Sequence, residues 1–159
     1  MAKAGYSLLS GVVPLAAGTP KTAMFVTAGA QFGMDLKKFR IGFDGVTASA
    51  VPIFWELNYS TAATNSTPGT GNTSLTASIT QNYGRAIATT GFLAGGNCSS
   101  EPTVQTNIDG NLLTPNGGLL VYDFPLGDVP DAAVANGFAL RLTAPAIVNV
   151  RTSFLFERI

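Results

Sequence analysis

The chain has 159 residues, with nine lysines and arginines against nine aspartates and glutamates, a single cysteine and no histidine. Charged residues are 11% of the chain, against roughly 25% in an average soluble domain. Balanced charge argues against a basic face for nucleic acid or an anionic membrane. Without histidine, a zinc site or the usual base-activated nucleophile is excluded. We therefore expect a building or binding part rather than an enzyme, with no cofactor.

Length and hydrophobic content fit one domain with a real core, because 46% of the residues are hydrophobic. A net charge of zero gives weak repulsion between copies, so we expect a protein that lives in an assembly. Cys98 cannot form a disulfide within the chain, which suits synthesis in a reducing cytoplasm. The absence of an apolar run of eighteen residues predicts no membrane span.

Residues 1–20 form the first segment, with apolar side chains among small residues and no clear helical or strand period. These apolar residues are Leu8, Leu9, Val12, Val13 and Leu15. Two interpretations remain open: an extended N-terminal arm that lies along a partner, or the first strand of the same domain. The remaining residues, 21–159, are expected to form a single β-sandwich domain.

Three convincing strands follow at residues 22–27, 37–43 and 51–59, each rich in β-branched and aromatic residues. In the second of them, Phe39, Ile41 and Phe43 alternate with Lys38, Arg40 and Gly42. This period of two is typical of a strand with one face in the core. Residues 60–74 are almost entirely Thr, Ser, Asn, Gly and Pro, which predicts a long exposed connection.

The second half of the chain repeats this pattern of short strands and turns. Weaker strands are predicted at residues 75–79, 86–93 and 103–108, the last of them ended by a turn at Asp109-Gly110-Asn111. Firm strands are predicted at residues 119–124, 138–142 and 148–156. One helical turn is predicted at residues 130–135. Many short strands at this spacing predict an all-β protein: an antiparallel, jelly-roll-like sandwich of about eight strands.

Two groups of side chains are candidates for ligand chemistry. The aromatic residues Phe54, Trp55, Tyr59 and Tyr83 could form a platform for stacking sugars, although Trp55 lies in the most hydrophobic strand and suits the core better. The nearest set of acids is Asp123, Asp128 and Asp131. It is better explained as a turn with a helix cap than as a catalytic or calcium site.

Residues 136–158, with the sequence NGFALRLTAPAIVNVRTSFLFER, carry a resemblance to a known family. Alternating strands flank an Ala-Pro-Ala connection in which proline has no N–H to donate. This segment resembles the closing hairpin of small β-sandwich virion proteins of tailed bacteriophages, and is most like that of capsid decoration proteins.

The resemblance implies a homotrimer on the capsid surface that binds the major capsid protein and stabilises the shell, after synthesis in the host cytoplasm. Under it, the shell contacts would come from the arm residues Tyr6, Leu8, Leu9, Val12 and Val13. Arg141 and Arg151, as neighbours in the closing hairpin, would line a subunit interface with Glu56 or Glu157. The alternative is a tail, baseplate or fibre subunit that binds host glycans.

Overall fold

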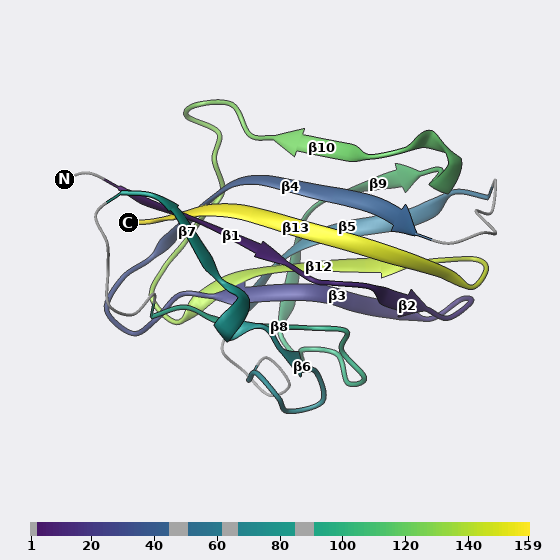
Figure 1. Cartoon of the computed structure of the whole chain (residues 1–159), viewed down its shortest axis with the longest axis horizontal. Helices are drawn as coiled ribbons and strands as arrows, with labels where there is room; N and C mark the ends of the chain where they lie inside the picture. The colour runs from purple at the N-terminus through teal and green to yellow at the C-terminus, as the bar shows by residue number, and fades with distance from the viewer. Residues whose placement is uncertain (1–2, 45–50, 62–66, 85–90) are drawn as a thin grey trace.

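The structure is a computed structural model that describes residues 3–44, 51–61, 67–84 and 91–159. Two antiparallel sheets pack face to face, and the described residues contain thirteen strands and two short 3₁₀ helices, η1 (Thr76–Ser78) and η2 (Pro115–Gly117) (Figure 1). The predicted all-β antiparallel sandwich is therefore confirmed, with more strands than the eight expected.

The first sheet has seven strands. In spatial order it contains β10 (Leu120–Asp123), β4 (Met34–Asp44), β13 (Val148–Arg158), β1 (Ala4–Leu9) and β7 (Thr80–Tyr83), with β11 (Asp131–Ala132) beside β4 and β2 (Val13–Leu15) beside β13. Its two longest strands, β4 and β13, are neighbours over nearly their whole length. They hold the middle of this sheet together.

The second sheet has six strands. In spatial order it contains β6 (Thr73–Ser74), β8 (Leu93–Gly96), β3 (Pro20–Thr27), β12 (Asn136–Thr143), β5 (Ile53–Thr61) and β9 (Gln105–Leu113). The consecutive strands β3, β4 and β5 change sheet at each connection. Such crossings bring segments from distant parts of the chain into one core.

The core lies between the two sheets and takes alternate side chains from each long strand, as the period of two predicts. On β4, Phe39 and Ile41 are buried, and on β13 the buried set includes Phe154 and Phe156. Trp55 of β5 fills the centre, 4% exposed, with its ring centroid 5.2 Å from that of Phe39. The interior is thus closed by aromatic packing between the sheets.

The N-terminal segment is the first strand of the sandwich and not an arm. β1 pairs with β13 from Ala4↔Arg158 to Leu9↔Ser153, so the two ends of the described chain lie side by side (Figure 1). Tyr6, Leu8 and Val13 are completely buried, so the prediction that these three residues contact the shell is wrong. Leu9 and Val12, at 63% and 43% exposure, remain on the surface.

The predicted closing hairpin is also wrong. β12 lies in the six-stranded sheet and β13 in the seven-stranded sheet, so the connection around Pro145 crosses from one sheet to the other. The turn residues Ala144-Pro145-Ala146 predict a tight connection between two strands. They do not show whether the two strands lie in the same sheet, as in a hairpin, or in different sheets. Arg141 and Arg151 are consequently in different sheets and are not cross-strand neighbours.

Three local predictions also need correction. Residues 130–135 contain the short strand β11 in place of a helical turn, and residues 75–79 contain η1 in place of a strand. The predicted turn at Asp109-Gly110-Asn111 lies inside β9, where a register shift in the pairing with β5 accommodates it. Residues 86–90 of another predicted strand lie outside the described residues.

Candidate functional site

The chain's own segment 97–104 covers part of the outer face of the six-stranded sheet, over β3 and β12, while Phe54 and Leu112 of β5 and β9 are exposed. Backbone N–H groups of Asn97 and Cys98 donate to carbonyls of β3 at 3.0 and 3.1 Å. Beneath this segment, Phe25, Cys98 and Ala139 form a small apolar cluster outside the main core. Burial, and after it the charge of Glu101, raises the pKa of the Cys98 thiol to about 12. This thiol is therefore unreactive at neutral pH.

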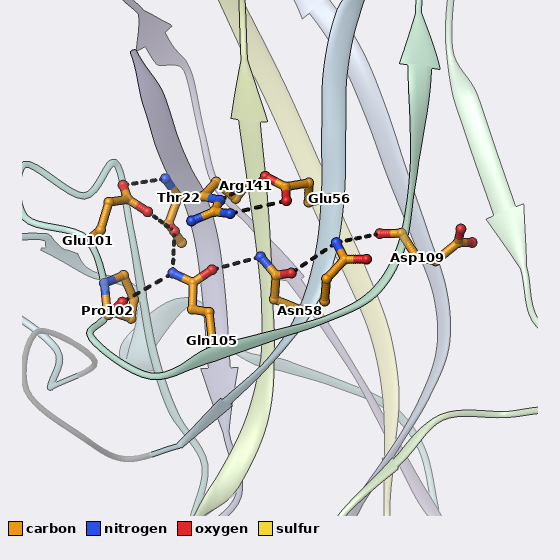
Figure 2. Close-up of polar contacts among 9 residues, drawn as sticks. Thr22, Glu56, Asn58, Glu101, Pro102, Gln105, Asp109 and Arg141 are labelled. Atoms are coloured by element: carbon orange, nitrogen blue, oxygen red, sulfur yellow. Dashed lines mark hydrogen bonds and ion pairs between the residues drawn. The ribbon is translucent and has the colours of Figure 1, made fainter.

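Polar side chains continue across this covered face as one hydrogen-bonded network (Figure 2). Glu101 accepts from the backbone N–H of Thr22 at 2.7 Å and from its hydroxyl at 2.5 Å. The amide of Gln105 donates to the Thr22 hydroxyl at 3.1 Å and accepts from Asn58 at 2.8 Å. Asn58 is only 1% exposed, so these bonds satisfy a buried amide and link β3, β5 and β9.

Two of the predicted interface residues belong to the same face. Arg141 of β12 and Glu56 of β5 are cross-strand neighbours, and the guanidinium donates to both carboxylate oxygens at 2.9 and 3.1 Å. This bidentate contact raises the pKa of Arg141 above its ordinary value. The two charges thus bind each other within one chain.

Glu157, the third predicted interface residue, lies at one end of the outer face of the seven-stranded sheet. Lys3 contacts Asp35 at 2.7 Å and Lys37 contacts Glu157 at 3.2 Å, so two cations and two anions alternate. The Tyr83 hydroxyl donates to Glu157 at 2.5 Å. The cluster ties β1, β4, β7 and β13 together.

Gly5 is required by this arrangement. It lies between Glu157 and Tyr83 across β13, β1 and β7, and a Cβ at this position would overlap the Tyr83 ring. Burial and the bond to Glu157 raise the pKa of Tyr83 to about 12. Partial burial opposes ionisation of Glu157, but Tyr83 and the lysines outweigh it and hold the pKa of this carboxyl below its usual value.

The rest of this outer face carries exposed apolar side chains and cations. One row crosses four neighbouring strands through Val121 of β10, Arg40 of β4, Ser153 of β13 and Leu9 of β1. Val121 and Leu9 are 45% and 63% exposed. We call the following residues the open face: Leu9, Lys38, Arg40, Leu119, Val121, Arg151 and Ser153.

The cations of the open face differ in their partners. Lys38 contacts Asp123 at 2.7 Å, and Arg151, the fourth predicted interface residue, contacts Asp44 at 2.9 Å. Arg40 forms no ion pair or side-chain hydrogen bond with any residue in the described ranges. Strand alternation had placed Arg40 on a wet face, but nothing in the sequence showed which residues would surround it.

The sheet edges are less suited to binding a partner than the open face. Among the described residues, five strands that pair on one side only are two to four residues long: β2, β6, β7, β10 and β11. The other edge strand, β9, has nine residues, but its Gly110 and Leu112 amides donate at 2.8 Å to the side-chain oxygens of Asp109 and Asn111. Amides occupied in this way are not free to pair with an added strand.

The aromatic residues considered for sugar stacking do not form one platform. Trp55 is buried in the core, and Tyr83 lies in the other sheet from Phe54 and Tyr59. Tyr59 packs on Phe138 with ring centroids 5.3 Å apart. The four residues therefore do not form the shared surface that the sugar-stacking interpretation needs.

The predicted set of acids, Asp123, Asp128 and Asp131, does not form a cluster either. Asp123 is paired with Lys38, while Asp131 lies in β11. Within the described ranges, no group of three or more Cys, Asp or Glu side chains has a geometry suited to a metal ion. One cleft of about 320 Å³ lies beside the covered face, lined by residues that include Lys21, Cys98 and Glu101.

Comparison with known proteins adds no relative. No protein-family model matches the chain, and no curated protein is significantly similar to it in sequence. Among the described residues, no helix has the length and apolar character needed to cross a membrane.

Proposed function

We propose that this chain is a virion structural protein that decorates a phage capsid. It binds the outer surface of the major capsid protein shell through the open face, assembles there as a trimer, and stabilises the shell. The observation that carries this proposal is the difference between the two outer faces. One is covered in part by the chain's own segment and by a satisfied polar network, whereas the other exposes Leu9, Leu119 and Val121 beside Arg40, which has no partner among the described residues.

Exposed aliphatic side chains that lie together on the outer face of a sheet are suited to contact with another protein. The likeness of residues 136–158 to decoration proteins supports the choice of partner, although the connection within that segment joins two sheets rather than forming a hairpin. Of the predicted shell contacts in the N-terminal segment, only Leu9 and Val12 are exposed, since Tyr6, Leu8 and Val13 are in the core.

The experiment compares two leucines of equal exposure on opposite faces. Leu9 lies on the open face and Leu112 on the six-stranded sheet, and each is 63% exposed. Purified wild-type protein, Leu9→Asp and Leu112→Asp are sized by light scattering. Each is then sedimented with undecorated shells of the phage whose genome encodes the chain. We expect a trimer that binds shells, with binding lost in Leu9→Asp and retained in Leu112→Asp.

Two outcomes would contradict the proposal. A folded wild-type protein that does not sediment with shells would remove the capsid surface as its site and favour a tail, baseplate or fibre position. Equal loss of binding in both variants, with both still folded, would show that the open face has no special part in binding. Circular dichroism on the same samples checks that each variant is folded.

A further inference from the structure

We infer that the open face recognises a protein surface that presents a carboxylate among aliphatic side chains, and that Arg40 pairs with this carboxylate. The inference rests on the proposed function for the identity of the partner, the capsid shell. It adds the chemistry by which that partner is recognised and the residue at the centre of the contact.

The position of Arg40 supports this role. Its direct cross-strand neighbours are Val121 on one side and Ser153 on the other, with Leu9 beyond Ser153. Strands in a sheet are about 4.8 Å apart, so Val121 lies about 5 Å and Leu9 about 10 Å from Arg40 along the row. Leu119 lies over Gly42, two residues further along β4. Along its own row, Arg40 thus lies between aliphatic and small side chains, with the cations Lys38 and Arg151 one position away on either side.

The charge balance of the face defines the complementary group. Lys38 and Arg151 have partners in Asp123 and Asp44, so among the described residues the Arg40 guanidinium is the surplus positive charge of this face. A nucleic-acid backbone is recognised by several cations together, so one surplus arginine between Ser153 and Val121 is a poor fit for it. Guanidinium pairs with carboxylate in a bidentate geometry, and arginine is enriched at the energetic centres of protein interfaces.

The size of the face also fits a protein. β4 and β13 have eleven residues each, which gives a length of about 35 Å, and four strands give a width of about 15 to 20 Å. The whole outer face of this sheet, which is the open face together with the neighbouring charge cluster around Glu157, thus has an area of roughly 600 Å² and approaches the 800 Å² or so that each partner buries in a standard interface. A small ligand would leave most of this face exposed, whereas one protein surface can cover it.

The test uses the same full-length protein and the same undecorated shells, with binding measured as a dissociation constant at two salt concentrations. The variants are Arg40→Gln, Arg40→Lys and Arg40→Glu. The matched control is Arg141→Gln, which removes a guanidinium that is paired with Glu56 on the six-stranded sheet, outside the open face. We expect Arg40→Gln to weaken binding at least about tenfold and Arg40→Glu about a hundredfold or more, with Arg40→Lys intermediate. Arg141→Gln, checked by circular dichroism to be folded, is expected to stay within about threefold of wild type.

The outcomes separate this inference from the function on which it rests. If wild-type protein fails to bind shells, the proposed function is wrong and the inference falls with it. If wild-type protein binds but Arg40→Gln and Arg40→Glu bind equally well, only the inference is wrong. If Arg40→Glu instead converts a wild-type oligomer to monomers in the absence of shells, the face contacts a second copy of the chain. That result also overturns the assignment to the shell.

Discussion

Substitution of the adjacent residues Leu8 and Leu9 tests whether the N-terminal segment is a strand of the sandwich. Leu8 is completely buried and Leu9 is 63% exposed, because successive side chains of β1 point to opposite faces of the sheet. Leu8→Ala leaves a cavity in the core and should lower the free energy of unfolding by about 2 to 5 kcal/mol. Leu9→Ala removes surface contacts only and should change it by less than about 0.5 kcal/mol.

For a chain of this length, each kcal/mol corresponds to a shift of about 2 to 4 °C in Tm. Thermal unfolding followed by circular dichroism should therefore show a fall of about 5 to 15 °C for Leu8→Ala and less than about 2 °C for Leu9→Ala. Equal, small shifts in both variants would refute the reasoning, since a free arm would make no distinction between neighbouring leucines.

Three further predictions concern the charge cluster and the long sheet edge. Because the pKa of Glu157 is lowered in the folded state, its contribution to stability is present above its ordinary pKa and is lost as pH falls through the folded value. Urea denaturation should therefore show a steeper loss of stability between about pH 5 and 3 for wild type than for Glu157→Gln. Parallel curves of stability against pH for the two proteins would contradict this. Gly5→Ala should displace the Tyr83 ring and cost about 1 to 3 kcal/mol; in a Tyr83→Ala background the same change should cost much less, and an additive double mutant would rule out the clash. Replacing Asp109 and Asn111 together by alanine frees two amides of β9, so light scattering should show mass increasing with concentration; an unchanged monomer or trimer would mean that these side chains do not protect the edge.

Much of the fold could be predicted from alternation within single strands. Phe39 and Ile41 were correctly expected on the opposite face of β4 from Arg40, because a period of two records which side chains avoid water. The sheet in which each strand lies was not predictable in this way. The connection around Pro145 has the same turn chemistry whether it stays within a sheet or crosses the core, so the closing hairpin was predicted where a crossing occurs.

The candidate site was less predictable, since it is made by pairing between distant segments. Arg40 is in the first third of the chain, whereas its neighbours Val121 and Ser153 are in the last third and Leu9 is near the beginning. Tyr6 and Leu8 have the spacing of two that is typical of one face of a strand. Leu9 is also apolar but lies on the opposite, exposed face, so the alternation of apolar and polar residues is broken there. An exposed leucine that breaks the alternation is itself a mark of the open face.

The central position of β13 has a consequence for how the chain acquires its structure. β13 separates β4 from β1 and also pairs with β2, so the middle of the seven-stranded sheet is missing until residues 148–158 have been synthesised. During translation, β1 and β4 must therefore remain without their common partner while most of the chain is made. Pairings between such distant segments form slowly. We expect this protein to spend a long interval with unpaired strands, in which chaperones would determine its yield.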